Sequence, residues 1–397
     1  MSEARVLTKF VLLLAAGLLV GGGCSSLSKH HDRPGEDDAA NKSMFNMDKF
    51  SEQMKKAGKT LVGKGENPDK ARARYAEAES KYREASQAEA SQRKQLFLAA
   101  AKDFKEAADR WPDSALEIDA MFLSGESYFF ADQYPKANNQ FEALLKKYPN
   151  SRYLDLIEAR RFSLAEYWLK HHEDHPRPLV AANLTDRSRP TFDEFGHAVR
   201  VFDRIRIDDP TGKLADDATL AAANAYFSAH RYIDADNFYT DLRKTFPNSE
   251  HQFAAHYLGL KAKLLSYQGS DYSGVPLSEA EKLVQQMRRQ FPQQAAQEQD
   301  FLARAYAEVR FKKGEREWKM ASYHQRRSEY GAARFYYDAL VKNYSDTPFA
   351  ERAQEQMLAI GGKPPVPPQR LTWLVDAFPK EENSKPLIAT AEAPKKR

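Results

Sequence analysis

One phrase recurs along the chain and limits what the chain can fold into. At 136–151 it reads KANNQFEALLKKYPNS. Twelve residues before the Pro stands Ala, eight before it a large apolar residue, and five before it a further apolar residue. The same three positions precede six reference points: Pro112, Pro149, Pro210, Pro247, Pro292 and Ser345. So many coincidences at fixed offsets indicate an internal repeat.

The offsets place the repeated side chains on one face of a helix. Ala137, Phe141 and Leu144 are four and three residues apart, which is the spacing of an apolar stripe on an α-helix. The small Ala lets a neighbouring helix approach, and the aromatic ring fills the space beside it. The terminal Pro cannot continue a helix without losing a hydrogen bond, so it separates one helix from the next.

Another helix precedes each stripe. Upstream of Ala137 the sequence MFLSGESYFFADQYP places Gly125 and Tyr128 on a first helix, turns at ADQ and reaches the second helix near Tyr134. The unit is a helix–turn–helix of about 34 residues with the G-x2-Y, A-x3-F and Pro pattern of tetratricopeptide repeats. We therefore predict an all-α tetratricopeptide-repeat solenoid of stacked helix pairs over residues 69–360.

Unequal spacing of the reference points indicates insertions. The step from Pro149 to Pro210 exceeds one repeat, and the excess falls at 170–190, which is rich in turn-forming residues. We expect this insertion to bind a partner outside the groove of the solenoid. The step after Pro292 leaves room for an extra helix at about 296–313.

The first residues resemble an export signal. Arg5 and Lys9 precede the apolar run FVLLLAAGLLV and then GGGC, and Cys24 is the only Cys of the chain. A run of roughly 7–15 apolar residues is typical of a secretory signal and short for a membrane-spanning helix. Small residues before a lone Cys resemble a bacterial lipoprotein signal, so we predict a signal peptide at 1–23 and lipidation of Cys24, with palmitate. The alternatives are an ordinary signal cleaved near Gly23 and an uncleaved anchor.

The segments before and after the repeat region are not expected to form repeats. Residues 24–68 are mostly polar and cannot bury enough apolar surface to offset their ordering entropy, which predicts a flexible tether. Residues 361–397 begin with GGKPPVPPQ, a stiff Pro-rich spacer, and end as a tail. RLTWLVDAF at 370–378 is too apolar for a solvated tail. It either folds back on the last repeat or docks on a partner.

The chain has no motif that indicates catalysis. It lacks P-loop, G-x-G-x-x-G, G-x-S-x-G and C-x-x-C patterns. HHEDH at 171–175 contains zinc-ligand residue types, but no HExxH arrangement is present. We predict no catalytic residue, no cofactor and no metal; the alternative is a metal-dependent enzyme that uses His171 and His175. With 60 basic and 56 acidic residues the net charge is +4, so nucleic acid is not expected as a partner.

A binding role fits stacked helix pairs, because the first helix of each pair lines the inner surface of such a solenoid. Aromatic, amide and carboxylate side chains on these helices suit an extended peptide. The predicted groove residues are Phe122, Glu126, Phe129, Phe130, Asn224 and Phe227. The alternative for each Phe is that it fills the core between helices.

Three stretches resemble the BamD-like outer-membrane protein assembly lipoproteins. They are the early pair from DFKEAADRWPDS to KANNQFEALLKKYPNS, the polar insertion with TDRS at 185–188, and the last repeat ASYHQRRSEYGAARFYYDALVKNYSDTPFAERA at 321–353. Additional repeat material between Pro210 and Pro292, a longer tether and a Pro-rich tail depart from that family.

The resemblance implies a non-catalytic scaffold that is lipid-anchored in the outer membrane and faces the periplasm. Its partners would be the barrel subunit of the β-barrel assembly machine, other envelope proteins and peptide segments of unfolded barrel proteins. The alternative function is a tetratricopeptide lipoprotein scaffold of another envelope process, such as cell-wall coordination.

Overall fold

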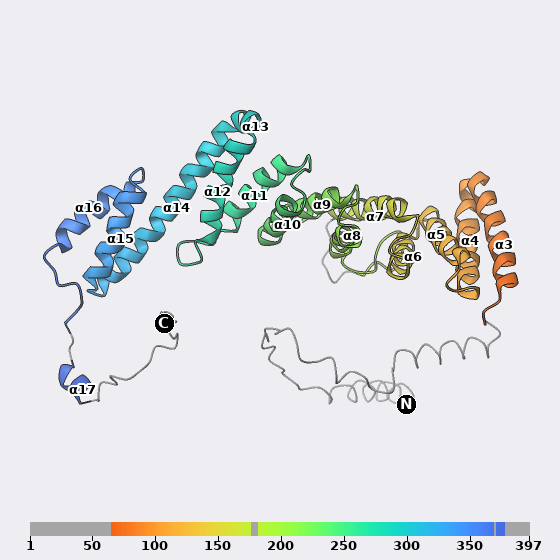
Figure 1. Cartoon of the computed structure of the whole chain (residues 1–397), viewed down its shortest axis with the longest axis horizontal. Helices are drawn as coiled ribbons and strands as arrows, with labels where there is room; N and C mark the ends of the chain where they lie inside the picture. The colour runs from red at the N-terminus through yellow and green to blue at the C-terminus, as the bar shows by residue number, and fades with distance from the viewer. Residues whose placement is uncertain (1–64, 176–181, 369–370, 378–397) are drawn as a thin grey trace, which may run out of the picture. The chain divides into compact units, whose positions relative to one another are not determined.

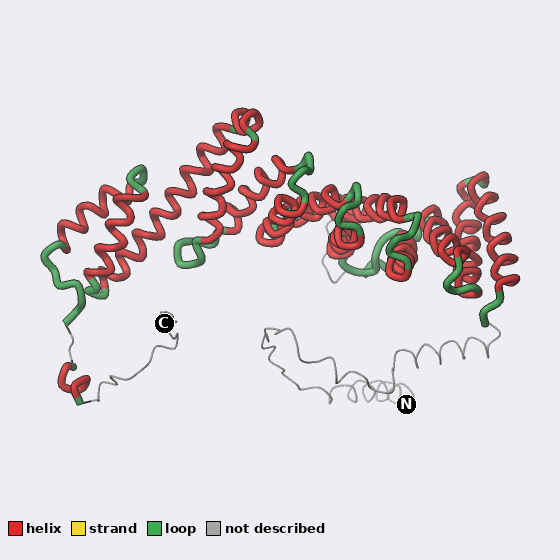
Figure 2. The backbone as a smooth tube through the Cα atoms, viewed as in Figure 1, coloured by secondary structure: helices red, strands yellow, loops and turns green. Residues whose placement is uncertain are grey.

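The computed structural model describes residues 65–175, 182–368 and 371–377, and every regular element in these ranges is a helix (Figure 1; Figure 2). The helices are α3 (Pro68–Gln87), α4 (Ala90–Arg110), α5 (Ala115–Phe130), α6 (Tyr134–Lys147), α7 (Leu154–Asp174), α8 (Glu194–Asp208), α9 (Ala215–Ser228), α10 (Tyr232–Thr245), α11 (Gln252–Ser266), α12 (Val275–Gln290), α13 (Pro292–Gln297), α14 (Gln299–Arg326), α15 (Tyr330–Asn343), α16 (Pro348–Ile360) and α17 (Thr372–Asp376). None of the helices in these ranges combines the length and the apolar character that a membrane crossing requires.

Several sequence predictions concern residues outside the described ranges. These are the signal peptide at 1–23, the lipidation of Cys24, the tether up to residue 64, positions 176–181 of the insertion and positions 378–397 of the tail. They remain predictions.

Consecutive helices pack as pairs: α3 with α4, α5 with α6, α7 with α8, α9 with α10, α11 with α12 and α14 with α15. Each pair also contacts the next, for example through α4 and α5 or through α8 and α9. The last helix of the array, α16, packs on α15 and α14. The predicted all-α fold of stacked helix pairs is therefore confirmed.

The repeated apolar positions form the core of the second helix in every pair. All of them are at most 1% exposed. They are the small residues Ala100, Ala137, Ala198, Ala235, Ala280 and Ala333, the large residues Phe104, Phe141, Phe202, Tyr239, Val284 and Tyr337, and the third positions Ala107, Leu144, Ile205, Leu242, Met287 and Leu340. The helical period read from the sequence thus gives the buried face directly.

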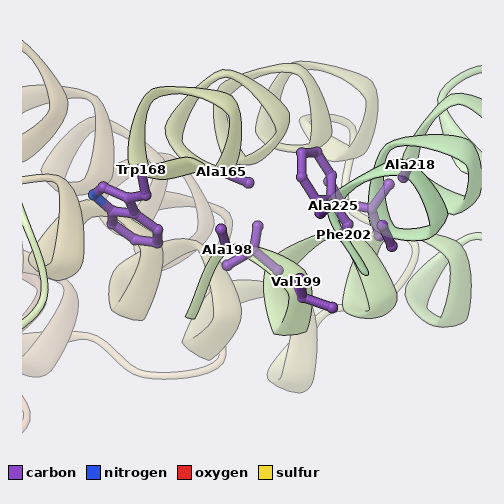
Figure 3. Packing of buried hydrophobic residues seen from close by; sticks show 10 residues of the cluster. Ala165, Trp168, Ala198, Val199, Phe202, Ala218 and Ala225 are labelled. Atoms are coloured by element: carbon purple, nitrogen blue, oxygen red, sulfur yellow. The ribbon is translucent and has the colours of Figure 1, made fainter. Parts of the chain in front are cut away.

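One of these cores joins α7, α8 and α9 (Figure 3). Ala165 and Trp168 of α7 pack with Ala198 and Phe202 of α8, and Ala218 and Ala225 contribute from α9. The Phe202 ring also meets the edge of Phe162, with ring centroids 5.1 Å apart. Small residues on both sides of the large rings allow the three helices to approach closely.

The turn between paired helices has the same backbone in three pairs. Asp132, His230 and Ser328 adopt left-handed φ angles of 56°, 58° and 62°. Each stands five residues before the repeated Ala of its pair. In the first turn Asp132 N donates to Phe129 O, and Gln133 N donates to Tyr128 O. This is the Schellman arrangement that closes a helix C-terminus.

Pro and side-chain caps fix several helix starts. Asn67 accepts a hydrogen bond from Lys70 N at 2.9 Å, and Pro68 begins α3. Ser114 accepts from Glu117 N at 3.1 Å, while the Glu117 carboxylate accepts from Asp113 N at 2.7 Å. These contacts satisfy N–H groups that a helix leaves without partners in its first turn.

The extra helix expected at 296–313 belongs to a longer element. α13 is short, and α14 continues from Gln299 to Arg326. The first half of α14 shares a core with α12 through Leu302, Ala305 and Val309. Its second half packs with α15 and α16. No Pro interrupts this stretch, and Gly314 is tolerated because Thr347 and Phe349 pack directly on it.

We expect Gly125→Ala to lower the free energy of unfolding by about 1–3 kcal/mol. A Cβ at Gly125 would lie 2.7 Å from Cδ1 of the buried Phe141 ring, which has no space to move. Gly362→Ala is the control, because a Cβ there has no neighbour within 4 Å. Urea unfolding followed by circular dichroism measures both. Equal stability of the two variants would contradict this packing.

Candidate protein-interaction surface

An aromatic patch crosses the first three helix pairs (helices α3 to α7 in Figure 1). We use this name for Tyr82, Phe129, Phe130, Tyr134 and Tyr167, which come from α3, α5, α6 and α7. The rings follow one another in the order Tyr82, Phe130, Phe129, Tyr134 and Tyr167, with successive centroids 6.4, 5.5, 5.5 and 5.1 Å apart. Phe130 is 38% exposed and Tyr167 is 39% exposed, and the other three are partly buried.

A half-buried ion pair lies against the centre of the patch. Glu126 is 6% exposed and accepts two hydrogen bonds from Arg160, at 2.8 Å from Nε and 2.9 Å from Nη2. The guanidinium lies over two rings, 4.7 Å from the centroid of Phe129 and 5.3 Å from that of Phe130. Hydrogen bonds from Arg160 to Glu126 raise the pKa of this guanidinium. The bidentate geometry holds the cation against the rings, where it is attracted to their faces.

The insertion folds back onto the end of this patch. Tyr167 Oη lies 3.1 Å from Ser188 Oγ, and Trp168 Nε1 donates to Ser188 O at 2.9 Å. Asp186 accepts from the backbone and the hydroxyl of Ser188 and from Arg189 Nε. Burial by itself raises the pKa of Asp186, but the hydrogen bonds from Ser188 and Arg189 lower it to about 2. The carboxylate therefore stays ionised and keeps the loop closed.

The same loop presents apolar side chains to solvent. Asn183 donates its side-chain amide to the carbonyls of Asp186, Arg189 and Pro190, and its oxygen accepts from Asp186 N. Leu184 is nevertheless 85% exposed and Phe192 is 52% exposed. A loop fixed by its own hydrogen bonds that exposes large apolar groups is suited to a protein contact.

Of the histidines at 171–175, His171 lies in an ion-pair network. His171 Nδ1 is 3.1 Å from Glu194 Oε2 and 3.4 Å from Arg189 Nη1, and its ring stacks on His175 at 4.7 Å. Among the residues with described positions, no group of three or more His, Cys, Asp or Glu side chains is arranged to hold a metal ion.

The structure brings together only part of the predicted groove. Phe129, Phe130 and Glu126 lie together in the aromatic patch. Phe122 is 8% exposed and stacks on Tyr153 at 4.0 Å, so its ring has little surface left for a ligand.

The other two predicted groove residues lie on α9 and have partners of their own. Asn224 is exposed and accepts from Tyr239 Oη at 2.8 Å. Phe227 is half-buried against Tyr232, with ring centroids 5.4 Å apart. The described contacts link neither Asn224 nor Phe227 to the aromatic patch.

Sequence reasoning missed four residues of this surface. Tyr82 lies on α3, before the first occurrence of the repeated phrase, Tyr134 begins α6, and Arg160 and Tyr167 lie on α7. Arg160 and Tyr167 are seven residues apart, which puts them on one helix face. That spacing was a usable signal, whereas the ion pair to Glu126 was not visible in the sequence.

Comparison with known proteins agrees with the fold. The family model described as Tetratricopeptide repeat matches residues 119–151, which include most of α5 and all of α6. A search of curated proteins found no match to the chain. The stacked helix pairs are therefore of the tetratricopeptide type, and repeats of this type generally mediate protein–protein interactions.

Proposed function

We propose that this protein is a non-catalytic scaffold of the outer-membrane β-barrel assembly machine. In this proposal Cys24 carries a lipid that anchors the chain in the outer membrane, and the repeats face the periplasm. The signal-like start with its lone Cys, followed by tetratricopeptide-type repeats and a folded polar insertion, supports it. The observation that carries the binding role is the aromatic patch, because exposed rings around a fixed guanidinium are typical of protein-binding surfaces.

The patch would receive extended peptide segments of unfolded barrel proteins. Phe130 and Tyr167 offer rings to apolar side chains of such a peptide, and their 38% and 39% exposure leaves both accessible. The loop at 183–189, with Leu184 exposed beside the patch, would contact a folded partner subunit of the machine.

We expect Phe130→Ser to weaken binding of a labelled peptide segment of an outer-membrane barrel protein about tenfold, the loss of one central aromatic contact. Phe335→Ser is the matched control, because Phe335 is 70% exposed on α15, far from the patch in sequence. Fluorescence anisotropy with the full chain measures both affinities. Circular dichroism checks folding, and Tyr167→Ser serves as a second patch variant. Equal affinities for the patch and control variants would exclude the patch as the binding site.

Affinity isolation from a mild-detergent extract tests the assembly role itself. Recovery of the barrel subunit of the assembly machine supports the proposal. Recovery of cell-wall enzymes without any barrel-assembly subunit would assign the scaffold to cell-wall coordination instead.

Mass spectrometry of the mature N-terminus tests whether Cys24 is lipidated. An unmodified start anywhere other than Cys24 refutes lipidation.

A further inference from the structure

Two cavities lined mainly by polar and charged residue types adjoin on the part of the chain that follows the aromatic patch. The first, of about 680 Å³, lies between the end of α10, the start of α11 and α12. The second, of about 520 Å³, lies between the start of α12 and α14. Glu279 and Lys282 of α12 line both cavities, so the two cavities adjoin at α12, and we treat them together as one groove.

Basic side chains from four helices line this groove. We call it the basic groove and define it by Arg243, Lys244, Lys263, Lys282, Lys313 and Arg316. The carboxylates that line it are those of Glu279 and Glu317. Two further carboxylates lie close by, since Asp236 binds Lys263 Nζ at 2.7 Å and Glu281 binds Lys313 Nζ at 2.7 Å. After these pairings the lining still has an excess of positive charge.

One largely buried cation of the basic groove, Arg243, is held in place by the fold. Arg243 Nη1 donates to Ala255 O at 2.7 Å, and Nη2 donates to Thr240 Oγ1 at 2.7 Å. The guanidinium lies directly over Gly259, where a Cβ would collide with Nη1. Its side chain is 10% exposed, and the nearest carboxylate oxygen, on Asp236, is 4.0 Å away. Asp236 is bound more closely by Lys263, at 2.7 Å, so Arg243 shares this carboxylate and has only one long ion pair. A largely buried cation in this situation favours a further anion beside it.

Two cations at the rim are free to bind a ligand. Lys244 and Lys282 are exposed, and no carboxylate in the described part of the chain forms an ion pair with either of them. Gln252 is buried and its Nε2 already donates to Leu242 O and Phe246 O, but the amide side chains of Asn248, Gln286 and Gln290 also line the first cavity and are at least partly exposed. Such groups can donate to and accept from the backbone of an extended peptide.

The distribution of the charges favours an extended ligand over a compact one. The cations follow one another from α10 across α12 to α14 and do not converge on a single point. A lone phosphate or carboxylate would need several donors aimed at one position. We propose that the basic groove binds an extended acidic peptide segment of a partner protein, with carboxylates placed in series along the cations.

This site is separate from the aromatic patch and does not depend on the proposed function. Its probe is a fluorescein-labelled ten-residue peptide of alternating Glu and Ser, titrated with the full chain and followed by anisotropy. The double variant Lys244→Glu/Lys282→Glu is expected to bind at least tenfold more weakly, because two attractive charges become repulsive. Lys102→Glu/Lys105→Glu is the matched control, since both lysines are exposed on α4, outside the groove. The control keeps the wild-type affinity.

Four outcomes decide the inference. Weaker binding of the groove variant alone, together with loss of affinity at higher salt, supports it. Equal losses in both double variants would mean non-specific attraction and would overturn it. It is also overturned if the same peptide with Gln in place of Glu binds equally well, or if a single-stranded oligonucleotide binds more tightly than the acidic peptide. Phe130→Ser should leave the affinity for the acidic peptide unchanged, which separates this test from that of the aromatic patch.

Discussion

Replacing Phe202 with Ala is expected to lower the free energy of unfolding by about 3–5 kcal/mol. The Phe202 ring is fully buried where α7, α8 and α9 meet, and its removal leaves a cavity that the surrounding Ala and Val residues cannot fill. Because each pair in a repeat array depends on its neighbours, loss of this core weakens the contact between two repeats. Urea unfolding of the full chain measures the change.

The matched control for this prediction is Ile207→Ala on the same helix. Ile207 is 51% exposed, so its truncation is expected to change stability by less than about 1 kcal/mol. Hydrogen exchange should show the largest loss of protection in α7, α8 and α9 for the Phe202 variant. Comparable losses of stability and of exchange protection in the two variants would mean that the face of α8 that carries Phe202 is not buried.

Glu158→Gln is expected to remove a pH dependence of stability between about pH 4.5 and 7. Glu158 is 2% exposed on α7, and its Oε1 has no hydrogen-bond partner. Burial first, and then the nearby carboxylate of Asp209, raise the pKa of Glu158 from its ordinary 4.5 to about 7, although Arg161 opposes this. The folded protein therefore holds this proton more tightly than the unfolded chain.

The sign follows from that difference in proton affinity. Well below pH 4.5 Glu158 is protonated in both the folded and the unfolded state, so its ionisation does not change the free energy of unfolding. As the pH rises towards 7, ionisation becomes favourable in the unfolded chain first, so the folded state loses up to about 3 kcal/mol of relative stability. The Gln variant cannot ionise, so it should match the wild type near pH 4 and exceed it at pH 8. Asp155, Asp208 and Asp209 are present in both proteins, so the comparison isolates the change at Glu158.

Denaturant unfolding at pH 4 and pH 8 gives the comparison. Glu166→Gln is the control, because Glu166 is exposed on the same helix, and it should keep the wild-type pH profile. If Glu158→Gln also follows the wild-type profile, Glu158 is not the buried carboxyl that the packing of α7 indicates.

The buried face of each second helix could be predicted from the sequence. The period that relates Ala137, Phe141 and Leu144 holds in six repeats, and the corresponding side chains are all removed from solvent. The helix pairing follows from the same pattern, because a helix with one apolar stripe must bury it against a neighbour. Gly125 was identified as a first-helix position, and its contact with Phe141 explains why no larger residue fits there.

The turns and the length of α14 could not be predicted in the same way. Left-handed φ angles usually indicate Gly, yet Asp132, His230 and Ser328 occupy these positions, so no residue type marks them. α14 passes through the expected boundary at 313 because Gly314 is packed against Thr347 and Phe349, which are more than thirty residues away.

The sequence by itself determined the repeat, the all-helical class and the inward face of every repeated stripe, because these depend on the period of a single helix. Only the tertiary structure decided which side chains from different helices meet. Arg160 reaches Glu126 and the rings of α5, and Lys282 lies between two cavities, because of how neighbouring helices cross. The crossing depends on the fit of side chains between helices, and the period of one helix carries no information about it.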